Sequence, residues 1–354
     1  MTARRAFLAG AAGAVAMPAV VRAQEAVIWR MVTSWVRNLP GPGITAQRLA
    51  DRIGAMSGGR LKVDLHAAGE LVPALEVFDA VQGGTAEMAH TASFFWAGKM
   101  PAAQFFTSVP FGLLPLEHAA WIEHGGGQAL WDELYAPFGV KPFMAGNTGT
   151  SMGGWFRKEI GSLADLQGLR FRIPGLGGEM MRRIGANPTM VPPPEVLPAL
   201  QSGAIDATEF LGPWSDLAAG FYKAAPFYYW PGLHEPNGTG EAIVSLEAWE
   251  KLPADLRAVV ENACRAEAAF AVAEAEWQDQ AALDELVRLG ARLRRFPPDV
   301  EQAAREAAAE VLAAFDAKGG LDQRIYRSFA AMQARAVSWS RHASQAFLEA
   351  RNGV

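Results

Sequence analysis

Several protein classes are excluded by what this sequence contains little of. Cys264 is the only cysteine among 354 residues, so neither an internal disulfide nor a cysteine-based zinc site is possible. Charged residues make up 19% of the chain and the formal net charge is −5, which gives no sign of the basic patch that a nucleic-acid partner requires. The six histidines show no paired spacing of the kind that metal ligands have. No segment after the N-terminus is long and apolar enough to span a membrane.

The first 23 residues are typical of an export signal. Arg4 and Arg5 precede Ala-Phe-Leu in a twin-arginine pattern, and a run of small apolar residues follows to about Val21. Ala23 then ends a small-residue cleavage site before Gln24. No cysteine lies near that site, which argues against a lipoprotein. We therefore expect a twin-arginine signal peptide at residues 1–23 and a mature chain in the bacterial periplasm.

The N-terminal part of the mature chain alternates strand and helix patterns. Strands are expected at residues 27–32, 61–65 and 87–91, with helical spacing of apolar residues between them. This β-α-β-α-β order predicts a mostly parallel sheet with covering helices. The aromatic residues 94–96 directly follow the third strand and form either lobe core or the apolar wall of a cleft.

A second β-α-β set occupies residues 169–210, and long strands are expected on either side of residues 234–236. Two such sets joined by extended segments predict an α/β fold of two lobes with a cleft between them. We place the lobe boundaries as follows: lobe I at residues 24–148, completed by part of 239–320, and lobe II at residues 149–238.

The chain from Pro253 onward is alanine-rich and helical, and glycines and prolines divide it into three helices. The last of these, at residues 321–354, has a strong apolar stripe on one face. The stripe consists of Ile325, Phe329, Met332, Ala336, Trp339, Ala343 and Phe347. This face packs either on the chain's own lobes or on a second subunit.

Two glutamates stand out as candidate ligands. A short buried strand is expected at residues 204–210, with Glu209 near its carboxyl end, and Glu235 likewise falls at the end of an apolar strand. Ligands bind outside the carboxyl ends of strands in open α/β sheets. Two carboxylates in one dry cleft repel each other unless a cation or a proton joins them. Hard oxygen ligands of this kind suit Ca²⁺, Mg²⁺ or Na⁺ rather than zinc.

Arg172 lies in the expected strand at residues 169–173, on the same face as Arg170. An arginine on a cleft strand can hold a carboxylate in a bidentate fork. The alternative is a surface or structural ion pair.

Ser151 lies in Gly149-Thr150-Ser151-Met152-Gly153, which matches the Gly-x-Ser-x-Gly nucleophile elbow. That motif requires a helix after the serine, whereas the residues that follow here have a strand pattern. A secreted serine esterase that uses Ser151 is therefore an alternative to a binding protein.

Two longer motifs carry a resemblance to a known family. These are Ser-Leu-Ala-Asp-Leu-Gln-Gly-Leu-Arg-Phe-Arg at residues 162–172 and Ala-Leu-Gln-Ser-Gly-Ala-Ile-Asp-Ala-Thr-Glu at residues 199–209. With them the mature chain resembles the substrate-binding proteins of TRAP (tripartite ATP-independent periplasmic) transporters. Gly-Asn-Thr-Gly at 146–149, Gly-Pro-Trp at 212–214 and Gly-Leu-His-Glu-Pro at 232–236 are similar to the subgroup that binds 2-oxo acids such as pyruvate, or 2-hydroxy acids such as lactate, with a metal cation.

The resemblance implies roles for particular residues. Arg172 matches the arginine that grips the ligand carboxylate, and Glu209, the Phe210 carbonyl and Glu235 match the ligands of a Na⁺ or Ca²⁺ ion. Phe210 replaces the usual tryptophan, and Ser151 replaces the usual glutamine that bridges cation and ligand. The family also implies two lobes joined by hinge strands, delivery of the ligand to a TRAP membrane permease rather than catalysis, and in this subgroup dimers through the C-terminal helix. The other alternative is a binding protein of an ABC importer, which also has two lobes that close on a ligand.

Overall fold

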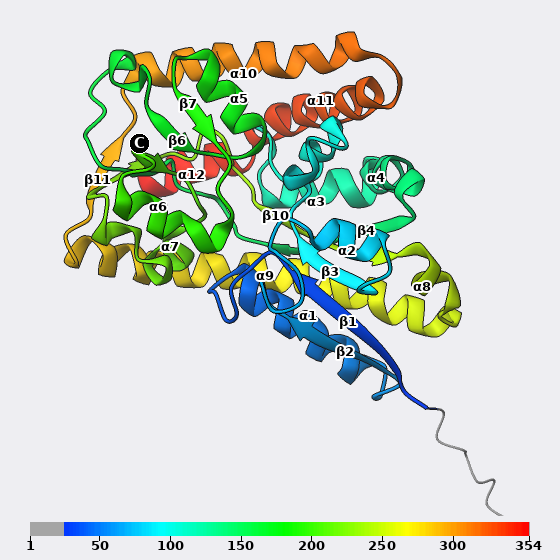
Figure 1. The fold of residues 1–354 in the computed structure, drawn as a ribbon. Helices are drawn as coiled ribbons and strands as arrows, with labels where there is room; N and C mark the ends of the chain where they lie inside the picture. Colours follow the sequence, from blue (N-terminus) through cyan, green and yellow to red (C-terminus); the bar gives the residue numbers. More distant parts are fainter. Residues whose placement is uncertain (1–24, 354) are drawn as a thin grey trace, which may run out of the picture.

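The computed structural model describes residues 25–353, which fold into two lobes (Figure 1). The predicted export signal at residues 1–23 lies outside the described residues. Within residues 25–353, no helix combines the length and the apolarity that crossing a membrane requires.

Lobe I is built on a five-stranded sheet with the strand order β2-β1-β3-β10-β4. The strands are β1 (Val27–Thr33), β2 (Leu61–His66), β3 (Met88–Thr91), β4 (Val140–Asn147) and β10 (Thr239–Ser245). β1 pairs in parallel with β2 and β3 through the helices α1 (Pro42–Met56) and α2 (Val77–Gln82), so the predicted β-α-β-α-β order is confirmed. β10 returns from lobe II and runs antiparallel to β3 and β4.

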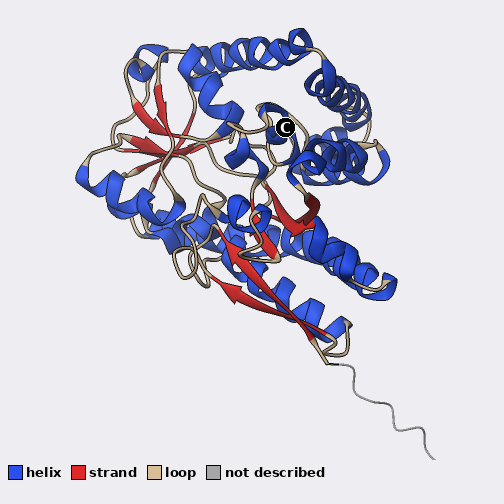
Figure 2. Cartoon of the chain, turned by 45° about the vertical axis from the view of Figure 1, so that its right-hand side comes forward, coloured by secondary structure: helices blue, strands red, loops and turns tan. Residues whose placement is uncertain are grey.

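Lobe II contains a six-stranded sheet with the order β11-β9-β5-β8-β6-β7. Its strands are β5 (Gly154–Phe156), β6 (Arg170–Arg172), β7 (Asn187–Thr189), β8 (Ala207–Thr208), β9 (Phe227–Trp230) and β11 (Arg292–Arg295). The helices α5 (Gly175–Arg183), α6 (Val196–Ser202) and α7 (Pro213–Ala219) lie between them. Figure 2 shows the two sheets as separate red groups, each with helices around it.

The helix α9 (Ala254–Arg288) runs along both lobes (Figure 1). Its first half contributes Leu256 and Val260 to the lobe I core, and its second half contributes Leu286 to a core cluster of lobe II. The strand β11 that follows was not expected from the sequence, and it pairs in parallel with β9. The chain after β10 therefore supplies structure to both lobes.

The remaining helices are α3 (Pro115–His124), α4 (Gly127–Tyr135), α8 (Leu246–Lys251), α10 (Pro298–Lys318), α11 (Gly320–Ser340) and α12 (Ser344–Asn352). The apolar stripe of the last segment is divided between two environments. Ile325 and Phe329 are buried in the core of lobe I, where the Phe329 ring packs on Trp121. Trp339 and Phe347 are 72% and 64% exposed. The stripe thus packs on its own lobe at its start and leaves an exposed apolar face at its end.

Candidate functional site

Arg172 ends β6 and its side chain is only 3% exposed. Its Nη1 donates to Glu209 Oε1 at 2.6 Å and to the Glu209 carbonyl at 3.2 Å, while Nε donates to the Val191 carbonyl at 3.2 Å. Within residues 25–353, no protein acceptor takes a hydrogen bond from Nη2. Arg172 therefore forms a buried ion pair through Nη1, and its Nη2 remains available to another acceptor.

Glu209 directly follows β8, which is parallel to β6 and pairs Thr208 with Arg172. This pairing places Glu209 one residue past Arg172 at the carboxyl edge of the sheet. The second carboxylate oxygen, Oε2, lies 3.0 Å from Nε2 of His234. The Glu209 carboxylate is therefore buried between a guanidinium and an imidazole.

Glu235 is also buried and lies beside Ser151. Ser151 Oγ donates to Glu235 Oε1 at 3.3 Å, and the Ser151 backbone N–H donates to the Glu235 carbonyl at 3.4 Å. Glu209, His234 and Glu235 each offer one ligand atom, and these three atoms lie within 4.8 Å of one another. The structure thus brings the two candidate glutamates and Arg172 together in one cluster.

Burial dominates the electrostatics of this cluster. It raises the pKa of Glu235 well above the usual value, and the neighbouring Glu209 raises it further. Burial also lowers the pKa of Arg172, although the two glutamates oppose that shift. One guanidinium faces two carboxylates, so a bound cation would relieve the repulsion between them.

The loop after β8 presents one free carbonyl beside this cluster. The carbonyls of Glu209, Leu211 and Gly212 each accept a hydrogen bond, from Arg172, Met152 and Asp216 respectively. The Phe210 carbonyl accepts none from the residues that the structure describes. A carbonyl and two carboxylates are oxygen ligands of the type that Na⁺ or Ca²⁺ takes, so the residues fit such an ion.

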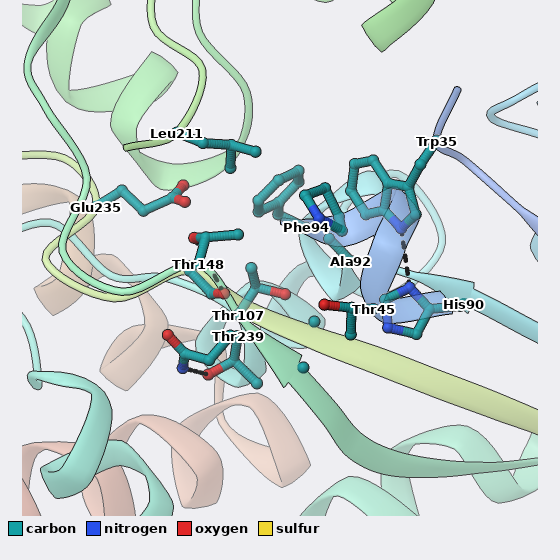
Figure 3. Close-up of a pocket in the computed structure, with 15 residues that line it drawn as sticks. Trp35, Thr45, His90, Ala92, Phe94, Thr107, Thr148, Leu211, Glu235 and Thr239 are labelled. Carbon is teal, nitrogen blue, oxygen red and sulfur yellow. Dashed lines mark hydrogen bonds between the residues drawn. The ribbon is translucent and has the colours of Figure 1, made fainter. Parts of the chain in front are cut away.

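A small cavity of about 30 Å³ adjoins Glu235 (Figure 3). Figure 3 shows the Glu235 carboxylate at one end and Trp35 and Phe94 at the other. Its wall also includes Leu211, Thr45, Thr148, Thr107, Thr239 and Ala92.

At the end of the cavity opposite Glu235, the ring nitrogens of Trp35 and His90 are already hydrogen-bonded. Trp35 Nε1 donates to His90 Nδ1 at 2.9 Å, and His90 Nε2 lies 3.2 Å from the Ala145 carbonyl. Burial lowers the pKa of His90 to about 4, so the ring is neutral and Nε2 donates to that carbonyl. Because these hydrogen bonds use the ring nitrogens of Trp35 and His90, neither residue offers a charge or a free donor to a ligand at this end of the cavity.

Both interpretations of the aromatic segment apply, to different residues. Trp96 is buried in the lobe I core, whereas Phe94 lines the cavity. Phe210 is buried, and its ring centroid lies 5.8 Å from Cζ of Arg172. His234 was not predicted as a site residue, because no paired histidine spacing marks it. Its position next to Glu235 was the available signal.

The surroundings of Ser151 do not suit a nucleophile. The residues after it form the strand β5 rather than the helix that a nucleophile elbow requires. Its hydroxyl donates to a carboxylate and has no contact with a histidine in the described part of the chain. The esterase alternative therefore has no support in the geometry.

The comparisons agree with this arrangement. Residues 41–318 match the model of "Bacterial extracellular solute-binding protein, family 7". The monocarboxylate 2-oxoacid-binding periplasmic protein of Nostoc sp. is 42% identical over 315 residues, which are 89% of this chain and 86% of that protein.

Two solved structures are similar over almost the whole fold. A TRAP solute-binding protein from Bordetella bronchiseptica, a mixed-occupancy dimer with calcium and picolinate in one site, has a TM-score of 0.91 at 36% identity and covers 93% of this chain and 98% of its own. One from Pseudoalteromonas atlantica, with bound sodium and pyruvate, has a TM-score of 0.89 at 38% identity and covers 92% and 99%.

Proposed function

This chain belongs to bacterial extracellular solute-binding protein family 7, and from that premise we propose that it captures a 2-oxo or 2-hydroxy monocarboxylate together with a cation for a TRAP membrane permease. The family consists of solute receptors, so the chain is a binding protein rather than an enzyme. The observation that carries the proposal is the buried cluster of Arg172, Glu209 and Glu235 beside a small cavity.

Arg172 is the residue that we assign to the ligand carboxylate. Nη2 is the nitrogen still free to donate, because Nε and Nη1 already donate to protein carbonyls and to Glu209. A charge-assisted hydrogen bond from a buried guanidinium is stronger than one in water. The Glu209 pair holds the guanidinium in place before the ligand arrives.

Glu209, the Phe210 carbonyl and Glu235 are the groups that we assign to the cation. Such an ion would supply the positive charge that the second carboxylate lacks, and either Na⁺ or Ca²⁺ suits the oxygen donors. Ser151 donates to Glu235, and its short side chain leaves room for a water molecule between the ion and the ligand.

The cavity determines which carboxylic acids are suitable. Its described lining contains no lysine or arginine, and Arg172 itself lies beside the cavity rather than in its wall. A ligand carboxylate that reaches Arg172 would leave a second carboxylate without a partner in the cavity. The lobes also touch, since the Ser215 hydroxyl of α7 donates to the Pro40 carbonyl of lobe I at 2.8 Å. Entry of the ligand would therefore require the lobes to separate and then close around a small monocarboxylate.

Mass spectrometry of the ligand that co-purifies with the mature chain tests this function. The expected result is a 2-oxo or 2-hydroxy monocarboxylate. Calorimetry with pyruvate, and with propionate as the matched three-carbon control that lacks the 2-oxygen, then measures selectivity. Equal binding of the two, or a co-purified sugar or amino acid, would contradict the proposal.

A homodimer through the C-terminal region is a further part of the proposal. The exposed side chains of Trp339 and Phe347 lie on a face that the lobes do not cover, which is typical of an association surface. The similar Bordetella bronchiseptica protein is described as a dimer.

Sedimentation at micromolar concentration is expected to give a dimer for the wild-type chain and a monomer for the double variant Trp339→Ser/Phe347→Ser. Deletion of the whole segment is unsuitable because Ile325 and Phe329 belong to the lobe I core. A monomeric wild-type protein would defeat the prediction.

The extracytoplasmic location follows from the family. We further propose that residues 1–23 are a twin-arginine signal peptide and that the mature chain works in the periplasm. Export that persists after Arg4 and Arg5 are both replaced by lysine would contradict this route.

A further inference from the structure

Asp216 is a buried carboxylate next to the proposed cation site that has no role in the functions described so far. It lies in the first turn of α7 and is completely buried. Its Oδ2 accepts from Trp155 Nε1 and from the Tyr228 hydroxyl, each at 2.8 Å, and its Oδ1 accepts from the Leu211 backbone N–H at 3.2 Å. Burial raises the pKa of this carboxyl to about 8, and the three donors oppose that shift.

The contact with Leu211 matters because of the geometry of the peptide unit. The Leu211 N–H and the Phe210 carbonyl belong to the same planar peptide, and in a trans peptide they point in opposite directions. The Leu211 carbonyl is fixed as well, because it accepts from the Met152 N–H at 3.2 Å. A group that holds the Leu211 N–H therefore also sets the direction of the Phe210 carbonyl.

We propose that Asp216 is a positioning residue for the cation. By accepting the Leu211 N–H on one side of the peptide, it aims the Phe210 carbonyl at the ion on the other side. The inference rests on the proposed function, because it assigns that carbonyl to the cation. The rings of Trp155 and Tyr228 stack with their centroids 3.9 Å apart, and both residues hold the Asp216 carboxylate by donating to its Oδ2.

Asp279 provides a matched control, because it is a second carboxylate that contacts the chain after β8. It projects from α9, and its Oδ1 accepts from the Trp214 N–H at 2.9 Å. A Cβ on Gly212 would lie 2.7 Å from its Oδ2, so the absence of a side chain there permits this close approach. An asparagine at 279 keeps the single acceptor that Trp214 needs.

An asparagine at 216 cannot replace the aspartate in the same way. Both carboxylate oxygens of Asp216 face donors, whereas an amide has one oxygen and one NH₂ group. An amide whose oxygen faces Trp155 and Tyr228 keeps the two hydrogen bonds of 2.8 Å and turns its NH₂ group toward the Leu211 N–H, which gives up the longer bond of 3.2 Å. Asp216→Asn should release the Leu211 peptide, while Asp279→Asn should not disturb it.

The experiment measures the Ca²⁺ concentration at which the chelator-treated mature chain half-saturates with pyruvate. Loss of a residue that orients a metal ligand typically costs about 10–100-fold in metal affinity, and we expect a shift of that order for Asp216→Asn. Asp279→Asn is expected to leave the Ca²⁺ requirement unchanged. Saturating Ca²⁺ is expected to restore the wild-type affinity of Asp216→Asn for pyruvate, which it would not do for general damage to the lobe.

An unchanged Ca²⁺ requirement in Asp216→Asn, an equal shift in both variants, or a pyruvate affinity that stays low at saturating Ca²⁺ would overturn the inference. The thermal unfolding midpoint with and without Ca²⁺ provides a second readout, because an ion that binds only the folded state raises it. If Asp216→Asn does not fold, Asp216→Glu keeps the carboxyl group but displaces both oxygens, and the same shift is expected. Ca²⁺-independent binding of pyruvate by the wild-type chain would instead refute the cation part of the proposed function. That result needs no variant, so it is distinct from a failure of the Asp216 inference.

Discussion

Replacing Arg172 with alanine is expected to weaken carboxylate binding by a hundredfold or more. The guanidinium is buried, and among residues 25–353 it is the only cationic side chain paired with Glu209 other than His234, whose charge depends on protonation. Removing one partner of a buried ion pair typically costs about 3–5 kcal/mol. Because about 1.4 kcal/mol corresponds to a tenfold change in affinity, that range predicts at least a hundredfold loss.

Calorimetry with pyruvate measures this loss, and Arg170→Ala is the matched control. Arg170 lies two residues away on the same strand, is half exposed, and pairs with Asp206 at 2.6 Å on the surface. Its loss should leave affinity near the wild-type value because exposed pairs contribute little. Arg172→Lys should restore binding only in part, since lysine lacks the planar fork. A loss below about tenfold in Arg172→Ala would remove Arg172 from the ligand site.

The sequence was most informative where alternation and strand position determine placement. Residues at the carboxyl ends of parallel strands gather at one edge of a sheet, which is why Arg172 and Glu209 could be expected to meet. Arg172 pairs with Thr208 across the two parallel strands, and Glu209 is the residue that follows Thr208. The chemistry of the donors, two carboxylates and one guanidinium, was equally visible in the residue types.

The sequence was less informative where tertiary contacts decide the outcome. The apolar run 204–210 was expected to be strand throughout, yet β8 spans only Ala207–Thr208. Its neighbour β5 starts at Gly154, so the ladder ends there and Glu209 turns toward Arg172 instead. The arginine-rich strand β11 has no clear apolar alternation and is held by its pairing with β9. The role of Asp216 could not be predicted either, because its three hydrogen-bond donors come from separate parts of the sequence.

A second large effect is expected from removing the cation. With both glutamates ionised, they carry two negative charges, Arg172 carries one positive charge, and a bound monocarboxylate adds a third negative charge. Without metal the closed site would thus hold about two uncompensated negative charges in a low-dielectric environment, which is strongly unfavourable. Na⁺ would reduce this excess to about one charge, and Ca²⁺ would neutralise it. Acid and cation should therefore bind cooperatively, and linkage makes this coupling reciprocal. The alternative to a cation is a proton on Glu235, whose pKa burial and the neighbouring Glu209 raise.

The measurement is a pyruvate titration after exhaustive dialysis against a chelator in sodium-free buffer. Affinity is expected to fall by about tenfold or more, the usual size of a coupling between two ligands, and to return when Ca²⁺ or Na⁺ is added. Glu209→Gln should lose this response because the amide keeps the shape but not the charge.

Glu274→Gln is the matched control for that variant. Glu274 pairs with Arg48 on lobe I, so its loss removes one carboxylate without touching the cluster. Full affinity in the chelated buffer, together with wild-type binding by Glu209→Gln, would show that the two glutamates hold no metal. Protonation of Glu235, whose pKa is raised by burial and by Glu209, would then relieve the repulsion between the two carboxylates. Recovery with Ca²⁺ but not with Na⁺ would instead identify complete charge neutralisation as the condition for tight binding.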